Sequence, residues 1–146
     1  MASLHTSGLS QAVASALLRR WEADGGWERH VEGVQAFYRR RRDAMEASAR
    51  AHLGGLARWT TPTAGMFFWF DLRGSGCDDT ERLVMDDCRR AKVLLVPGAS
   101  FAADHAATPS PFARAAFSIA DEGQIDEGLA RLAGVLRGVR RPADDV

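Results

Sequence analysis

Lysine is nearly missing from this sequence: Lys92 is the only one, and all other residues in the Lys+Arg total are arginines. Long apolar runs are missing too, since none approaches the ~20 residues that span a bilayer. The N-terminal residues lack the basic start and apolar centre of a secretory signal. These absences predict a soluble, intracellular protein, cytoplasmic or mitochondrial, that does not bind a membrane.

Cysteine is also scarce. Cys77 and Cys88 are the only two, and they form neither a C-x-x-C pair nor a multi-cysteine framework. The histidines lie far apart, without the spacing that metal ligands need: His5, His30, His52 and His105. We therefore expect free thiols in a reducing compartment and no metal site.

Neither sign of charge is in excess, because Lys+Arg and Asp+Glu both number 19. A neutral chain has no overall field that attracts nucleic acid. The four arginines over 39–42 fall inside a predicted helix, where successive side chains turn by ~100° and fan around the cylinder instead of forming a stripe. The sequence therefore predicts no nucleic-acid partner.

The 146 residues are 46% hydrophobic, which suits one domain with a real core. Apolar residues at helical spacing predict a helix over 9–21, capped by Ser10 and ended by the Asp-Gly-Gly at 24–26. A second helical pattern over 27–53 is ~26 residues long, or ~40 Å of helix. We expect a helix of this length in a small domain to bridge two bodies.

Strand and helix signals alternate beyond this helix. Segments 56–61 and 66–72 are rich in aromatic and β-compatible residues and flank a turn, which predicts two neighbouring strands. Asp78, with Glu81 three residues later, predicts a capped helix. That helix would turn its apolar residues inward: Val84, Cys88 and Ala91.

The last elements complete the predicted fold. The short apolar run over 93–96 predicts a buried strand, because Pro97-Gly98 stops it. Asp121-x-x-Gln124 signals the start of a helix. That helix is amphipathic, with apolar residues on one face: Ile125, Leu129, Leu132 and Leu136. Together the elements predict an α+β fold, in which helices rest on a small sheet.

Arg114 lies in the middle of an apolar, alternating segment over 109–118. Two prolines restrict the approach to it, and 112–118 has the length and residue types of a short strand. Arginine presents a planar fork of donors that matches a carboxylate, so an arginine held by a strand can grip and orient an acid substrate. The alternative is a surface arginine on an edge strand, which spacing alone favours.

Four stretches resemble, in order and spacing, the C-terminal part of class I/II pyridoxal-phosphate aminotransferases. They are Leu4-His5-Thr6-Ser7, TAGMFFW at 63–69, VLLVPGASF at 93–101 and PSPFARAAFS at 109–118. The likeness is greatest to the kynurenine/2-aminoadipate aminotransferase group, and it runs from Met1 to about Arg137. The segments at 65–69 and 109–118 are the specific ones.

This resemblance implies a substrate-binding role for three residues. Arg114 would bind the substrate α-carboxylate, and Phe67 and Leu4 would line the pocket for the substrate side chain. Phe67 could equally be core, because side chains alternate along 67–70 and at least one pair must be buried. Where the family often has Tyr or Phe after Pro-Gly, this chain has Ala99-Ser100-Phe101. The sequence therefore does not assign the residue that forms this wall of the pocket.

The cofactor implied by the resemblance is pyridoxal 5'-phosphate, which needs a lysine for its Schiff base. Lys92 does not occupy the place of that lysine, and the family's cofactor-holding residues would fall upstream of Met1. We therefore expect no catalytic and no cofactor-binding residue in this chain. The complete enzyme would be a homodimer that transfers an amino group between an aromatic or acidic amino acid and a 2-oxo acid.

The resemblance also predicts how the chain is divided. Residues 1–26 would end the large cofactor domain, 27–55 would be the connecting helix, 56–139 would form the small C-terminal domain of the fold-type I transferase fold, and 140–146 would fray. The alternative is a truncated, non-catalytic product that serves as a binding or interaction module. A free-standing acid-binding domain is a third possibility.

Overall fold

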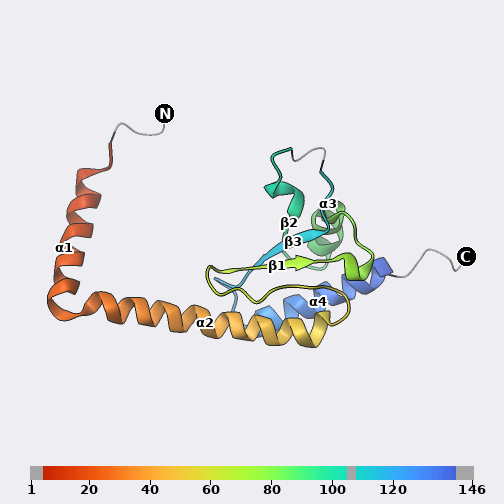
Figure 1. Cartoon of the computed structure of the whole chain (residues 1–146), viewed down its shortest axis with the longest axis horizontal. Helices are drawn as coiled ribbons and strands as arrows, with labels where there is room; N and C mark the ends of the chain where they lie inside the picture. Colours follow the sequence, from red (N-terminus) through yellow and green to blue (C-terminus); the bar gives the residue numbers. More distant parts are fainter. Residues whose placement is uncertain (1–4, 105–107, 141–146) are drawn as a thin grey trace, which may run out of the picture. The chain divides into compact units, whose positions relative to one another are not determined.

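The computed structural model describes residues 5–104 and 108–140 (Figure 1). The chain divides into two compact units, Met1–Phe37 and Tyr38–Val146. Helix α2 (Gly26–Leu53) contributes residues to both, and its 28 residues agree with the long helix expected from the sequence.

In the first unit, helix α1 (Gly8–Asp24) begins after Ser7, whose hydroxyl accepts a hydrogen bond from the Ser10 N–H at 3.5 Å. The predicted cap at Ser10 is therefore wrong by three positions, because Ser10 is the residue that donates to the cap. Gly25 ends the helix as predicted, with a left-handed φ of 68° and its N–H bonded to the Trp21 carbonyl. Glycine takes this conformation without the cost that a Cβ adds.

The second unit contains a three-stranded antiparallel sheet in the order β1-β3-β2. Its strands are β1 (Phe67–Asp71), β2 (Val96–Pro97) and β3 (Phe112–Ala116). Arg114 is on the central strand, where it pairs with Trp69 on one side and Val96 on the other. The edge-strand alternative for this arginine is therefore wrong.

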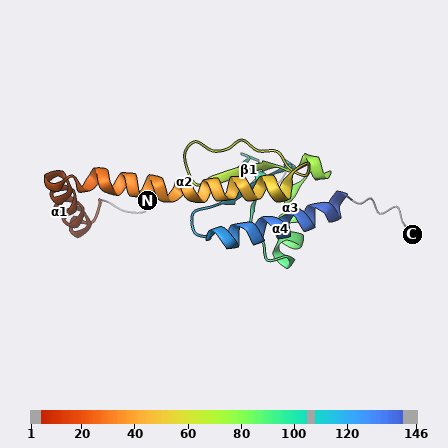
Figure 2. The ribbon, with the colours of Figure 1, turned by 90° about the horizontal axis from the view of Figure 1, so that it is seen from below.

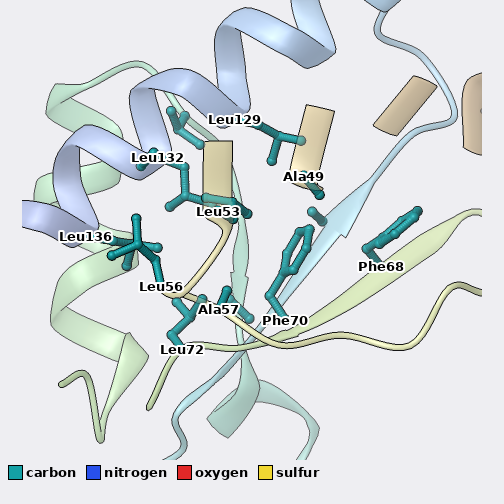
Figure 3. Close-up of a cluster of buried hydrophobic side chains, with 14 of the residues drawn as sticks. Ala49, Leu53, Leu56, Ala57, Phe68, Phe70, Leu72, Leu129, Leu132 and Leu136 are labelled. Carbon is teal, nitrogen blue, oxygen red and sulfur yellow. The ribbon is translucent and has the colours of Figure 1, made fainter. Parts of the chain in front are cut away.

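One face of this sheet packs against α4 (Glu122–Arg140) and the part of α2 that belongs to the second unit, and these two helical segments lie side by side (Figure 2). Because strand side chains alternate, Phe68 and Phe70 both point into this face and are fully buried (Figure 3). The predicted apolar stripe of α4 is buried as well: Ile125, Leu129, Leu132 and Leu136. Each large apolar side chain so buried contributes about 1.5–3 kcal/mol relative to exposure.

The two predicted helix starts have different outcomes. At α4, Asp121 and Gln124 exchange hydrogen bonds, with the Gln124 N–H donating to the Asp121 carboxylate at 2.8 Å, and this capping box is confirmed. At α3 (Thr80–Arg82) the cap is Asp79, not the predicted Asp78. Asp79 has the extended backbone that brings its carboxylate within 3.2 Å of the Glu81 N–H.

The helix begun by α3 continues through a π-helical turn, η2 (Leu83–Cys88). It buries Val84 and Cys88, as predicted, and leaves Ala91 only partly buried. Two further short 3-10 turns, η1 (Arg73–Ser75) and η3 (Gly98–Phe101), follow β1 and β2.

The predicted strand over 56–61 is wrong. The backbone N–H groups of Leu56 and Ala57 still bond to the Leu53 carbonyl at the end of α2, so they cannot enter a sheet. Only Arg58 forms a bridge, an isolated one to Asp71 of β1. The start of this segment is therefore a turn that ends α2.

The predicted strand over 93–96 is also shorter than expected, since β2 begins at Val96. The Val93 N–H bonds to the Cys88 carbonyl at 2.8 Å and closes the preceding helix. Leu94 is 85% exposed, so this run is not the fully buried strand that its composition predicted.

Glu46 of α2 binds the segment that follows the helix. Its carboxylate accepts hydrogen bonds from the Trp59 indole N–H at 2.9 Å, the Thr61 hydroxyl at 2.8 Å and Arg50 at 2.7 Å. Burial raises the pKa of this carboxyl, but the three donors outweigh burial and the net pKa is lowered below its ordinary 4.5. The ionised form therefore stabilises the fold.

We predict that Glu46→Gln lowers the free energy of unfolding by about 1–3 kcal/mol at pH 7. Because the folded-state pKa is lowered, this stabilisation is present in full above pH 4.5 and is lost as the pH falls through the folded-state pKa. Urea denaturation between pH 3 and 7 measures the difference. Glu127→Gln, which breaks an exposed pair with Arg131, is the control and should change stability by less than about 1 kcal/mol. If the loss of unfolding free energy in Glu46→Gln is the same at every pH, the ionised carboxylate is not the source of the stabilisation.

Candidate functional site

The face of the sheet opposite the core is open and carries aromatic residues around one arginine. Residues directly opposite in an antiparallel pair share a face, so Arg114 lies on this face with Trp69. Phe67 is two residues before Trp69 on β1 and is 42% exposed. The same alternation that buries Phe68 and Phe70 therefore excludes Phe67 from the core.

Two aromatic rings approach the Arg114 guanidinium. Its Cζ lies 4.2 Å from the ring centroid of Phe67 and 4.9 Å from that of Phe101. Phe67 belongs to β1, and Phe101 belongs to η3, the turn that directly follows β2, the strand on the other side of β3. Each such cation–π contact contributes ~0.5–1 kcal/mol at an exposed site and restricts the side chain.

Arg114 makes no ion pair and no side-chain hydrogen bond with residues in the described ranges 5–104 and 108–140. A guanidinium has five N–H donors, and a ring centroid near its Cζ does not accept a conventional hydrogen bond from them. The donor edge is therefore left for an acceptor from outside this part of the chain. A carboxylate matches that edge in charge and in geometry.

A second aromatic pair extends the open face. The Trp69 ring lies edge-on to Phe101, with centroids 5.2 Å apart, and stacks on Phe112 at 5.7 Å. Arg73 stands over Phe112 at 5.6 Å and pairs with Asp71 at 2.6 Å. The hydrogen bonds from Arg73 hold the pKa of Asp71 below its ordinary value, so this arginine, unlike Arg114, has its own carboxylate.

Thr80 connects the elements beneath this face. Its buried hydroxyl donates to the Phe112 carbonyl at 2.7 Å and accepts from the Gly98 N–H at 3.3 Å. A Cβ at Gly98 would lie 2.7 Å from the Phe112 carbonyl oxygen, so only glycine permits this approach. These contacts join η3, which carries Phe101, to β3, which carries Arg114.

The structure brings together two of the three predicted substrate-binding residues, Arg114 and Phe67. The third, Leu4, lies outside the described residues. Sequence reasoning missed Thr80 and left the wall at Phe101 open, because both act through contacts between segments distant in sequence. The period-two pattern of 67–70 could have placed Trp69 on the same face as Phe67.

Lys92 does not offer a site for pyridoxal phosphate. It is exposed and takes a left-handed φ of 58° where a helix ends, with its N–H bonded to the Arg89 carbonyl. The C-terminal end of a helix carries partial negative charge, which disfavours a phosphate. Lys92 is therefore poorly placed to hold a phosphate.

Cys77 and Cys88 are both free and buried. Burial raises the pKa of the Cys88 thiol to about 11 and raises that of Cys77, so neither is a thiolate at neutral pH. Ser48, Asp126 and His52 form a cluster, but Ser48 donates to Asp126 and not to His52. The three side chains therefore lack the Ser–His–carboxylate order of a nucleophilic triad. Within the described part of the chain, no group of three or more His, Cys, Asp or Glu side chains is arranged to hold a metal, and no helix is both long and apolar enough for a membrane span.

No protein-family model matches the chain. It is 37% identical over 94% of its length to kynurenine/alpha-aminoadipate aminotransferase, mitochondrial, of Bos taurus, and 40% identical over 95% to the enzyme of the same name from Rattus norvegicus. It spans only 31% and 32% of those two proteins. The chain thus covers about a third of the length of the curated relatives it matches.

Solved structures agree with these matches. The α-aminoadipate aminotransferase LysN of Thermus thermophilus, in complex with N-(5'-phosphopyridoxyl)-L-leucine, matches 94% of this chain and 33% of its own, with a TM-score of 0.77 and 28% identity. The kynurenine aminotransferase of Pyrococcus horikoshii matches 82% of this chain and 28% of its own, with a TM-score of 0.71 and 30% identity. The α+β fold class and the resemblance inferred from the four sequence stretches are confirmed.

We predict that Thr80→Val lowers the free energy of unfolding by about 1–3 kcal/mol, because the Gly98 N–H and the Phe112 carbonyl both lose a buried partner. Thr80→Ser is the matched control, since it keeps the hydroxyl and loses only a methyl group. Urea denaturation of the three proteins makes the comparison. Equal losses in the valine and serine variants would show that Thr80 acts by packing and not through its hydroxyl.

Proposed function

We propose that this chain, which resembles the C-terminal part of the kynurenine/α-aminoadipate aminotransferases, forms the substrate-recognition portion of a pyridoxal-phosphate aminotransferase. One observation carries the proposal: the Arg114 guanidinium has aromatic rings near it and no carboxylate of its own among the described residues. In the proposed role it binds the α-carboxylate that all amino-acid and 2-oxo-acid substrates share.

The position of Arg114 suits this role physically. A side chain on a central strand, with one ring from β1 and one from η3 beside it, has lost much of its rotamer freedom before any ligand arrives. A charge-assisted, bidentate pair with a carboxylate then contributes about 1.5–3 kcal/mol. A substrate bound in this way has a fixed orientation at its α-carbon, which is the atom that exchanges the amino group.

The open face also suits the rest of such a substrate. Phe67, Trp69 and Phe101 together expose apolar ring surface, each being between 40% and 49% exposed. Aromatic rings pack on aromatic or long aliphatic substrate side chains. We propose that Phe67, with Leu4, lines the side-chain pocket and that the substrates are aromatic or acidic amino acids, in keeping with the names of the relatives.

In this proposal the residues that hold pyridoxal phosphate belong to other parts of the complete, homodimeric enzyme. Residues 1–26 would belong to the large cofactor domain, 27–55 would be the connecting helix and 56–139 would form the small domain. Our proposal for the chain itself is therefore binding and orientation of the substrate, not the transfer step.

We predict that Arg114→Ala in the full-length enzyme weakens amino-acid binding roughly ten- to a hundredfold and leaves cofactor affinity unchanged. Arg114→Lys should restore binding only in part, because a point charge cannot reproduce the planar fork. Steady-state kinetics and spectroscopic cofactor titration measure the two affinities. Arg73→Ala, which removes an arginine that already pairs with Asp71, is the matched control and should change substrate affinity little. Unchanged substrate affinity in Arg114→Ala would remove this residue from the site.

A further inference from the structure

Trp69 is the residue opposite Arg114 in the pairing of β1 with β3. It is 40% exposed, and its ring contacts two other rings of the open face. The contact with Phe101 is edge-on, at 77° and 5.2 Å between centroids, whereas the contact with Phe112 is nearly parallel, at 18° and 5.7 Å. Offset-stacked and edge-on pairs are the favoured aromatic geometries.

The topology determines where these rings meet. Trp69 comes from β1, and Phe101 comes from η3, which directly follows β2. Because β1 and β2 flank β3 on opposite sides, Trp69 and Phe101 meet across the strand that carries Arg114. Phe112, the neighbouring open-face residue of β3, supports Trp69 from that same strand.

Phe101 contacts Trp69 from the end of a short turn. It ends η3, and its side chain is 49% exposed. The contacts that fix η3 are at its first residue, Gly98, which approaches the Phe112 carbonyl of β3 and donates its N–H to Thr80. A half-exposed ring at the far end of a short turn needs a partner to stay in one orientation, and Trp69 is a partner that it touches.

We infer that Trp69 is a positioning residue for the proposed carboxylate site: it holds Phe101 against the Arg114 guanidinium, so that the arginine is ordered before a substrate binds. The effect on carboxylate binding rests on the proposed function. The contacts from Trp69 to Phe101 and from Phe101 to Arg114 are observed in the structure and do not depend on that function. Trp69 acts in this scheme through Phe101 and not by touching the carboxylate.

The expected effect is moderate. Ordering one rotamer-rich side chain at a binding site costs enough to weaken affinity about two- to tenfold when that order is not already present. Removing Trp69 frees Phe101, which removes one of the two rings near Arg114 and leaves that of Phe67. The affinity for a carboxylate should therefore fall by this factor and should not be abolished.

NMR of the 146-residue chain with ¹⁵N-labelled arginine tests the inference. The Arg114 Nε–H signal is assigned by its loss in Arg114→Lys, and its chemical shift reports the nearby rings. We expect Trp69→Ala and Phe101→Ala to move this signal by similar amounts, and the double variant to move it no further. Trp69→Phe, which keeps an aromatic edge, should leave it near its original position. Titration with 2-oxoglutarate should give dissociation constants about two- to tenfold weaker in both alanine variants.

Each outcome bears on one claim. An unmoved Arg114 signal in Trp69→Ala, or additive changes in the double variant, would overturn the inference, because coupled residues do not act independently. If Trp69→Ala does not fold, Trp69→Leu and Phe101→Leu, singly and together, supply the same comparison with smaller changes in volume, and Trp69→Phe stays the control. If the variants move the signal as expected but 2-oxoglutarate leaves it unchanged in the parent chain, the positioning role of Trp69 stands and the proposed carboxylate function fails.

Discussion

The pairing of β3 with a strand on each side is the constraint on which the site depends. This pairing gives every residue of β3 a fixed face, so that Ala113 and Ala115 point into the core and Arg114 points out of it. A shift of one residue would bury the guanidinium among apolar side chains, at a cost of several kcal/mol for an unpaired charge. Burial of Ala113 and Ala115 therefore fixes the register of β3, and that register places Arg114 on the open face.

The same alternation divides the aromatic residues of β1 between two tasks. Phe68 and Phe70 fill the core against α2 and α4, whereas Phe67 and Trp69 form the open face. Thr80 ties this face to the core, since its hydroxyl joins the turn that carries Phe101 to the strand that carries Arg114. Core stability and the geometry of the site are thus coupled through a small number of contacts.

Local signals predicted much of the fold, and the errors arose at element ends, where competing backbone hydrogen bonds determine the boundary. The length of α2, the capping box at Asp121 and the buried stripe of α4 follow from periodicity and side-chain chemistry within a few turns. The strand expected over 56–61 fails because the Leu56 and Ala57 N–H groups bond back to the Leu53 carbonyl at the end of α2. The run over 93–96 is shortened by the left-handed turn at Lys92, a conformation rarely expected of a non-glycine residue.

Some residues of the candidate site were indicated before the structure was known, and others were not. The resemblance to the aminotransferases indicated Arg114 and Phe67, whereas spacing alone favoured a surface arginine and left Phe67 as core or pocket. Phe101 and Trp69 could not be assigned, since their roles arise only when η3 and β1 meet across β3. Leu4 stays a prediction, because it lies outside the described residues.

The most direct test of the central claim, that this chain recognises the substrate but does not carry the cofactor site, measures binding and turnover in one sample. The purified chain is mixed with pyridoxal phosphate, kynurenine or 2-aminoadipate, and 2-oxoglutarate; 2-oxoglutarate binding is followed by calorimetry and glutamate formation by chromatography. The account predicts that 2-oxoglutarate binds, that Arg114→Ala weakens this binding, and that no sustained glutamate is formed. Sustained glutamate formation that disappears in Lys92→Ala, or binding that is indifferent to Arg114, would contradict it.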